Sequence, residues 1–185
     1  MSIHLILGGA RSGKSRYAES LAKGQKFYVA TAEALDDEMQ QRIEAHRQQR
    51  GPGWETFDVP LDLVGALQTI DGKGRFILID CLTIWLSNLM LVKLDVRVEI
   101  AMLCECLMKI KSRVVLVSNE VGMGIVPANA LARTFRDDQG FLNQRIAEIA
   151  DEVVFITAGL PMVLKKAKRK VPPSKTRKSS RSRRA

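Results

Sequence analysis

The first group of residues that could do chemistry is a glycine-rich loop near the N-terminus. It reads Gly8-Gly9-Ala10-Arg11-Ser12-Gly13-Lys14-Ser15, which is the G-x-x-x-x-G-K-[ST] phosphate-binding pattern. An apolar run precedes the loop and a helix-like segment follows it, as this pattern requires. The glycines let successive backbone N–H groups point at phosphate oxygens, and the helix adds its positive N-terminal end. We expect Lys14 to contact the β- and γ-phosphates and Ser15 to ligate Mg²⁺.

A carboxylate at the end of another strand is the second group that magnesium needs in such a site. Asp80 follows the four apolar residues 76–79 and would supply it. A structural role is the alternative, with Asp80 as the N-cap of a helix that begins near Leu82. The two roles are compatible. The loop and Asp80 together predict a nucleoside triphosphate and Mg²⁺, but they do not predict which reaction follows.

A histidine on a charged, helix-like segment is the third candidate. Helical spacing over residues 36–50 puts Arg42, His46 and Arg50 on one face, with Arg47 beside them. Cations around an imidazole would bind an anion and disfavour protonation of the ring, which keeps a nitrogen free as a nucleophile. Spacing alone favours the plainer alternative, a solvated charged face.

A polar loop after another apolar run is the fourth candidate. Val114–Val117 leads into Ser118-Asn119-Glu120-Val121-Gly122, which is typical of a ligand-facing loop at the carboxyl edge of a sheet. Glu120 would act there as a general base or orient a substrate. A turn with a capping acid is an equal alternative. The other histidine, His4, lies in the first apolar run and is expected to be structural.

The elements that must position these residues alternate between strand and helix. Short, nearly continuous apolar runs predict strands that are covered on both faces, and the segments between them have helical periodicity. This alternation predicts an α/β three-layer fold with right-handed crossovers. The predicted strands are Ile3–Leu7, Phe27–Ala30, Phe76–Ile79, Val114–Val117 and Val153–Ile156, and Trp54–Val59 could add one. The predicted helices are Lys14–Lys23, Asp36–Arg50, Leu61–Thr69, Leu82–Val92, Val96–Lys111 and Ala128–Ala150.

Composition divides the chain of 185 residues into two parts. It carries 29 Lys and Arg against 20 Asp and Glu, a net charge of +9. Eleven of these cations and no acid lie in Lys165–Ala185, so the rest has 29 − 11 = 18 cations and a net charge of −2. We predict a nucleotide-binding catalytic domain over residues 1–164 and a basic, disordered tail over residues 165–185.

The cysteines and the apolar runs indicate a cytoplasmic protein without a membrane span. Cys81, Cys104 and Cys106 contain no Cys-x-x-Cys pair, so they predict neither a disulfide framework nor a zinc site. The longest apolar stretch, Cys81–Val92, is too short to cross a bilayer. The N-terminus lacks the basic region of a signal peptide.

Several blocks of residues make the chain similar to a known enzyme family. It resembles the bifunctional adenosylcobinamide kinase / adenosylcobinamide-phosphate guanylyltransferases of cobalamin biosynthesis. The most specific blocks are Asp36–Met39 with His46-Arg47, and Asn119–Gly122. The others are Gly8–Ser15, Ala30–Ala32, Asp80–Thr83 with Trp85-Leu86 and Asn88-Leu89, Phe135–Asp137, Asn143 and Gly159–Pro161.

The resemblance implies a fold, an assembly and two reactions. The fold is a RecA-like P-loop NTPase with a mostly parallel sheet, and the assembly is a homotrimer with sites near the subunit boundaries. In the first reaction a nucleoside triphosphate, ATP or GTP, phosphorylates the aminopropanol hydroxyl of adenosylcobinamide. In the second reaction GTP gives its GMP moiety to that phosphate through a histidine and releases pyrophosphate.

The resemblance also implies particular site residues. His46 occupies the position of the histidine that carries GMP, which reverses the preference drawn from spacing. We therefore predict His46, Lys14 and Glu120 as catalytic residues and Ser15 and Asp80 as Mg²⁺ ligands. The family more usually has Glu at the Asp58 position. The implied contacts with the guanine nucleotide are Ala32, Glu33, Ala34, Arg47, Gln48, Gln49, Arg50, Asp58 and Asp80.

Two features depart from the family pattern, and two other functions remain open. The connection Val92–Val98 is short, and the basic tail is extra. The tail could bind nucleic acid or an acidic surface by counterion release, although a solvated extension is favoured.

One alternative function is a small-molecule P-loop kinase that does not need His46. The other is a nucleic-acid-associated RecA-like ATPase, which 5% aromatic residues and a net charge of −2 outside the tail argue against.

Overall fold

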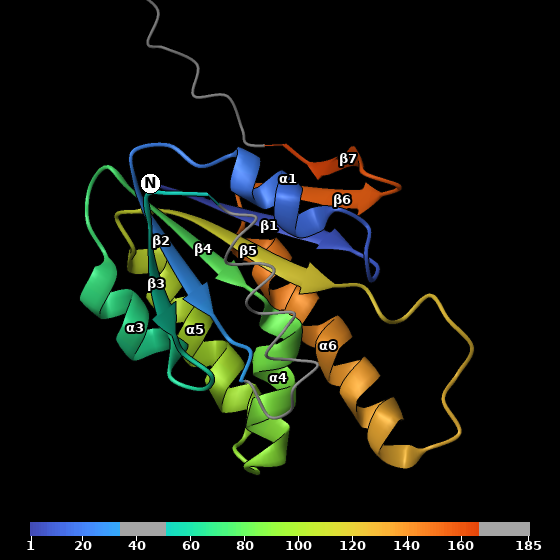
Figure 1. Ribbon diagram of the computed structural model, residues 1–185. Coiled ribbons are helices and arrows are strands. Elements are labelled where there is room, and N and C mark those ends of the chain that lie inside the picture. The colour runs from blue at the N-terminus through green and yellow to red at the C-terminus, as the bar shows by residue number, and fades with distance from the viewer. Residues whose placement is uncertain (34–50, 167–185) are drawn as a thin grey trace, which may run out of the picture.

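The computed structural model describes residues 1–33 and 51–166, in which a seven-stranded sheet carries helices on both faces (Figure 1). The strand order is β3-β2-β4-β5-β1-β6-β7, and all neighbours are parallel except β6 and β7. The strands are β1 (Ser2–Gly8), β2 (Gln25–Ala30), β3 (Trp54–Asp58), β4 (Arg75–Asp80), β5 (Arg113–Asn119), β6 (Glu152–Thr157) and β7 (Leu160–Lys165).

The helices form the two outer layers. Among the described residues, α1 covers one face of the sheet and the other four helices cover the opposite face (Figure 1). The predicted α/β three-layer fold is confirmed; the predicted helix Asp36–Arg50 lies outside the described residues. The helices are α1 (Lys14–Ser20), α3 (Leu63–Ile70), α4 (Leu82–Leu91), α5 (Val96–Lys109) and α6 (Ala130–Ile149). Within these ranges none is long and apolar enough to cross a membrane.

The central strands are buried on both faces, which explains their continuous apolar sequences. In β5, Val114 and Leu116 pack in the layer of α3 to α6, whereas Val115 and Val117 pack in the layer of α1. Side chains alternate between the faces of a strand, so each strand supplies both layers. A strand with only one covered face would instead alternate apolar and polar residues.

Local signals set where the helices begin. Asp62, Asp95 and Asn129 cap α3, α5 and α6, each by accepting a hydrogen bond from a backbone N–H of the first turn. The residue before α4 is Cys81, which makes no side-chain cap. Asp80 ends β4 and does not cap α4, so the alternative structural role considered for this carboxylate is wrong.

The last strand extends past the boundary that composition suggested. Lys165 belongs to β7, and its Nζ donates to the carbonyl oxygens of Ala147 and Glu148 at 2.9 Å each. These carbonyls belong to the last turn of α6, which a cation stabilises. The folded part of the chain therefore includes Lys165, one residue more than predicted.

Candidate active site

A pocket of about 770 Å³ lies at the carboxyl ends of β1, β4 and β5. Residues 10–16 and Glu19 form the side made by the phosphate loop and α1. Asp80, Cys81 and Ile84 form a second side, and Asn119 closes a third. The structure thus brings the predicted loop and the predicted magnesium ligands into one cavity.

Two positions of the phosphate loop, Gly8 and Gly13, require glycine. A Cβ on Gly8 would lie 2.6 Å from the carbonyl oxygen of Ile156. Gly13 has a φ of 93° and precedes α1 without a side-chain cap, so the first N–H groups of α1 keep their capacity to donate. Lys14 donates from Nζ to the Gly9 carbonyl at 3.1 Å. Loop and helix therefore present donors to an anion, as phosphate binding requires.

The magnesium ligands predicted from the sequence lie in the same pocket. Ser15 lines it from α1 and Asp80 from the end of β4, where Tyr28 donates its hydroxyl proton to Asp80 Oδ2 at 3.1 Å. Mg²⁺ prefers one or two carboxylates together with phosphate oxygens and water. One hydroxyl and one carboxylate beside a phosphate loop fit this preference. The described residues form no cluster of three or more His, Cys, Asp or Glu side chains that would hold a metal alone.

Asp58 lies on the same edge of the sheet but further from the phosphate loop. In the strand register Ala30 pairs with Asp58 on one side and with Asp80 on the other. Paired residues point to the same face, so the two carboxylates project together, two strand spacings or about 10 Å apart. Asp58 therefore projects on the same face as Asp80 without lining the pocket.

Cys81 lines the pocket without being a nucleophile. Its side chain is buried, and burial together with the Asp80 carboxylate raises the pKa of the thiol to about 11. The thiol is protonated at neutral pH, and a thiol must lose its proton to attack phosphorus or to bind a metal.

Polar residues of α4 tie together the loops that surround the pocket. Thr83 Oγ1 accepts a hydrogen bond from the Asn119 backbone N–H at 2.8 Å. One turn further, Asn88 Nδ2 donates to the carbonyl oxygens of Thr31 at 2.9 Å and Pro60 at 3.0 Å. The helix that follows Asp80 thereby fixes the ends of β2, β3 and β5. Sequence reasoning found these residues only as family blocks, without their contacts.

A buried polar cluster holds the end of β5 against α6. Ser118 donates to Asn143 Oδ1 at 2.7 Å, and Gln139 Nε2 donates to both residues, at 2.9 and 3.1 Å. Asn143 Nδ2 in turn donates to the carbonyl oxygen of Asn119 at 3.0 Å. Gln139 gave no signal in the sequence, because a glutamine within a helix predicts nothing about burial.

Glu120 and the residues after β2 do not line the pocket themselves. The Glu120 backbone N–H donates to the Gly8 carbonyl at 3.2 Å, which places this acid beside the phosphate loop. Its Oε1 accepts from Gly122 N at 2.6 Å, as in the turn considered from the sequence. Ala32 and Glu33 follow the buried Thr31. The other predicted residues, Ala34, His46, Arg47, Gln48, Gln49 and Arg50, lie outside the described residues.

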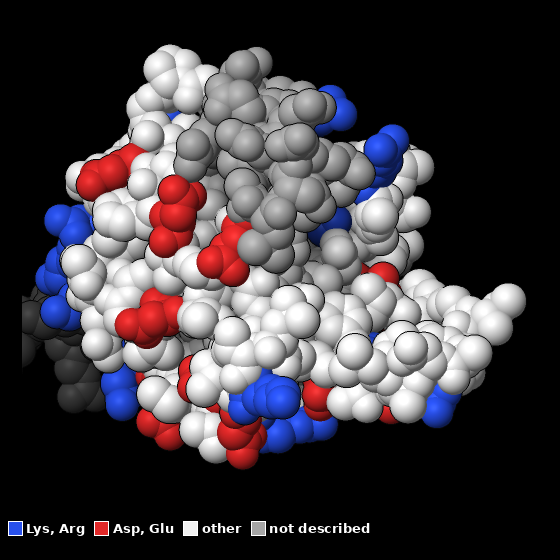
Figure 2. Space-filling view, turned by 60° about the horizontal axis from the view of Figure 1, so that its bottom comes forward, with Lys and Arg blue, Asp and Glu red and all other residues white. Residues whose placement is uncertain are grey.

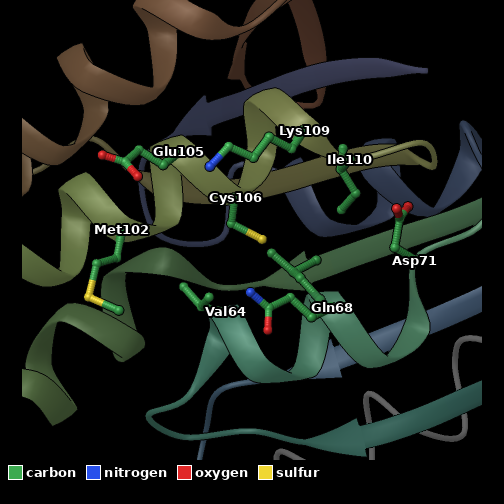
Figure 3. A pocket seen from close by; sticks show the side chains of 9 residues that line it. Val64, Gln68, Asp71, Met102, Glu105, Cys106, Lys109 and Ile110 are labelled. Atoms are coloured by element: carbon green, nitrogen blue, oxygen red, sulfur yellow. The ribbon is translucent and has the colours of Figure 1, made fainter.

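A second pocket, of about 440 Å³, lies between α3 and α5 (Figure 3). Cys106 points from α5 toward α3, and Asp71 stands at one end of the pocket (Figure 3). Hydrogen bonds from Ser112 and Lys111 lower the pKa of Asp71 despite its partial burial. Asp71 thus fixes the start of β5, and the pocket contains none of the predicted site residues.

Comparisons with known proteins identify the family. The family described as cobinamide kinase / cobinamide phosphate guanyltransferase matches residues 4–164. The bifunctional adenosylcobalamin biosynthesis protein CobP of Pseudomonas aeruginosa is 49% identical over 166 residues, which cover 87% of this chain and 96% of that protein. The corresponding CobU protein of Escherichia coli is 38% identical over 178 residues, covering 87% of this chain and 98% of that protein.

Solved structures share the fold at low sequence identity. An ATPase of a bacterial type III secretion system has a TM-score of 0.52 at 14% identity, covering 88% of this chain and 56% of that one. A Pyrococcus horikoshii protein also has a TM-score of 0.52, at 9% identity, covering 91% of this chain and 88% of that one. The predicted P-loop NTPase fold and the predicted resemblance are both confirmed. The chain belongs to the cobinamide kinase / cobinamide phosphate guanyltransferase family.

Proposed function

We propose that this chain phosphorylates the aminopropanol hydroxyl of adenosylcobinamide and then converts the product to adenosylcobinamide-GDP. The observation that carries the proposal is the phosphate-loop pocket with Asp80 and Ser15, in a chain that belongs to this family over residues 4–164. Nucleotides are substrates of both reactions. The corresponding products are a nucleoside diphosphate in the first and pyrophosphate in the second.

In the kinase reaction the phosphate loop binds the triphosphate. Lys14 and the N–H groups of the loop donate to the β- and γ-phosphates, since the donors of this loop line the pocket. Ser15 and Asp80 would hold Mg²⁺, which supplies positive charge to the phosphate oxygens. Glu120 accepts the proton of the attacking hydroxyl. Its position next to Gly8 supports this role, and Oε2 has no hydrogen bond within the described residues.

In the guanylyl transfer His46 attacks the α-phosphorus of GTP. The P–O bond to pyrophosphate breaks, and the histidine-bound GMP then passes to the phosphate of the corrinoid. The remaining contacts with the guanine nucleotide come from the ends of β2 and β3 and from the segment after His46. These residues are Ala32, Glu33, Ala34, Arg47, Gln48, Gln49, Arg50 and Asp58. Asp58 projects on the same face as Asp80, which supports its part in this set.

The intact mass of the protein after incubation with GTP and Mg²⁺ tests this function. We expect an acid-labile GMP adduct on the unaltered chain and none on His46→Ala. The chain has only two histidines, so His4→Gln is the matched control and should keep the adduct. An adduct on His46→Ala would contradict the assignment of the nucleophile. No adduct on any of the three, with GTP binding shown separately, would favour a kinase without guanylyl transfer.

We also propose that the enzyme works as a homotrimer in the cytoplasm. Exposed apolar side chains after β5 and at the start of α6, such as Ile125 and Leu131, support an assembly that covers them. The three cysteines are free in the structure, in keeping with a reducing compartment. The molar mass from light scattering tests the assembly, and a value for a monomer would contradict it.

A further inference from the structure

Asn119 has a fixed backbone, and within residues 1–33 and 51–166 its side chain makes no hydrogen bond. Thr83 accepts from its backbone N–H at 2.8 Å, and Asn143 donates to its carbonyl oxygen at 3.0 Å. Its side-chain Oδ1 is buried, and no residue in the described ranges donates a hydrogen bond to it. Buried amide oxygens are nearly always paired, so an orphaned one at the wall of a pocket indicates a ligand.

The sheet places Asn119 between the two parts of the phosphate site. Strand β5 lies between β1 and β4, and Asn119 pairs with Gly8, the first residue of the phosphate loop. On the other side Asp80 pairs with Val117, two residues before Asn119. Residues two apart on a strand point to the same face, so Asp80 and Asn119 share the face of α1. Both line the 770 Å³ pocket.

The chemistry of an amide fits the centre of a phosphoryl transfer. An amide has one donor end and one acceptor end. The phosphates of a nucleotide only accept hydrogen bonds at neutral pH, so they cannot satisfy Asn119 Oδ1. The attacking hydroxyl carries a donor, and the transferred phosphoryl group carries acceptors. A single amide can therefore contact both reactants and align them.

We propose that Asn119 is a catalytic residue of the kinase reaction, an inference that rests on the proposed function. Nδ2 donates to an oxygen of the γ-phosphoryl group, and Oδ1 accepts from the hydroxyl of the corrinoid. The hydroxyl oxygen forms the new bond to the γ-phosphorus while the bond to the bridging oxygen breaks. The electron pair of that bond stays on the nucleoside diphosphate. The single hydroxyl proton, hydrogen-bonded to Oδ1 before the reaction, passes to Glu120 as the new bond forms, because an amide oxygen is too weak a base to accept it.

The cluster behind Asn119 explains why one amide could have a large effect. Thr83 from α4 and Asn143 from α6 hold its backbone from two sides. Ser118 and Gln139 in turn hold Asn143. A catalytic group gains from such restraint, because small displacements of the reacting groups cost much of the rate.

The test compares the two reactions in the same variants of the full chain. We expect Asn119→Ala to lower kcat for phosphorylation of adenosylcobinamide about 100-fold, as the loss of one transition-state donor does. The Kd for GTP should rise about tenfold at most, because one hydrogen bond to the γ-phosphate is lost. The rate of GMP adduct formation from bound GTP should fall much less than the kinase rate, since that step has no attacking hydroxyl for Oδ1 to orient. Asn119→Asp keeps the shape and an acceptor but loses the donor, and it should be impaired at least as much.

Gln139→Ala is the matched structural control. Gln139 belongs to the same buried cluster but does not line the pocket, so its loss should lower Tm and change both reactions by the same factor. Kinase and adduct formation falling together in the Asn119 variants would show a structural role and overturn the proposal. A kinase rate within about threefold of the unaltered chain would overturn it too. Failure of the unaltered chain to phosphorylate the corrinoid would contradict the proposed function instead.

Discussion

His4, in the first half of β1, shows how burial controls the protonation of a side chain. His4 in β1 is 9% exposed, and its Nδ1 lies 3.1 Å from Glu152 Oε2. Burial, aided by Arg113, lowers the pKa of His4, although Glu152 and Asp151 act in the opposite direction. The loss of hydration on burial lowers the pKa of His4 more than the two carboxylates raise it. The imidazole is therefore neutral, and its Nδ1–H donates to Glu152.

This balance predicts a pH dependence of stability. The histidine has a pKa of about 6.5 in the unfolded state and a lower pKa in the folded state. At pH values between the two, the unfolded state therefore binds more protons. The free energy of unfolding contributed by His4 should be constant above about pH 6.5 and should fall as the pH decreases toward the folded pKa. Urea denaturation of the unaltered chain and His4→Gln at several pH values measures it. A difference between the two that does not change with pH would refute this account.

At the residue level, the sequence predicted groups with a local signature and missed those that need the sheet. Lys14 and Asp80 follow fixed patterns, a glycine loop and a strand that ends in an acid. Asn119 follows a strand as well, but its importance depends on β5 lying between β1 and β4. Sequence-based reasoning predicted the central strands but not their order.

Among the elements, α4 has the greatest influence on the site. It begins two residues after Asp80, and its polar residues hold three strand ends. Asn88 is buried and donates to Thr31 and Pro60, so its loss leaves two carbonyl oxygens without a donor. The residues that follow Thr31 lead toward the predicted nucleotide contacts.

We predict that Asn88→Ala destabilises the fold by about 1–3 kcal/mol, the cost of leaving buried polar groups unpaired. It should also slow GMP adduct formation more than phosphorylation, because in the loop after β2 Thr31 directly precedes the predicted guanine-nucleotide contacts Ala32 and Glu33. Denaturant titration measures the loss of stability, and the rates of GMP adduct formation and of phosphorylation measure the effect on catalysis. Ser87→Ala, one position earlier on α4 and only half-buried, is the control and should change neither property. Equal slowing of both reactions by Asn88→Ala would show that the loop has no separate role.

The strand that sequence analysis missed shows the limit of local patterns. β7 is exposed along its whole length. Its residues 160–164 are apolar, but they include Pro161, which cannot donate to a strand ladder and so weakens the expectation of a strand. A two-residue turn joins it to β6, and Ala158 and Gly159 in that turn have φ values of 50° and 78°. Such turns usually contain Asn or Asp before Gly. Ala158 takes that position here, so the sequence lacks the usual hairpin signal. The turn also reaches the active site, since Gly159 N donates to the Ser12 carbonyl at 2.9 Å.

For the whole molecule the distribution of charge separates the folded part from the extension. On the face shown in Figure 2, acidic and basic side chains are interspersed. A protein that binds nucleic acid electrostatically would carry a patch of one sign. The net charge of +9 comes from residues 165–185, because the remainder is at −2. Any affinity of this chain for polyanions should therefore be separable from its catalysis.

Truncation after Lys166 tests this separation, with truncation after Leu164 as the matched comparison. The first variant keeps the contacts of Lys165 with Ala147 and Glu148, so Tm and both reactions should match those of the full chain. The second loses them and should be less stable by about 0.3–1 kcal/mol, the usual contribution of a cation at a helix C-terminus.

Binding to a duplex DNA at low salt is the second measurement on the same two variants. Only the full chain should bind, and its affinity should fall steeply with salt, because the nine cations of residues 167–185 release counterions on binding. DNA should not change the rate of either reaction. Slower catalysis after truncation at Lys166, or stimulation of the full chain by DNA, would mean that residues 167–185 take part in the function. The catalytic unit would then extend beyond the sheet that now accounts for the site.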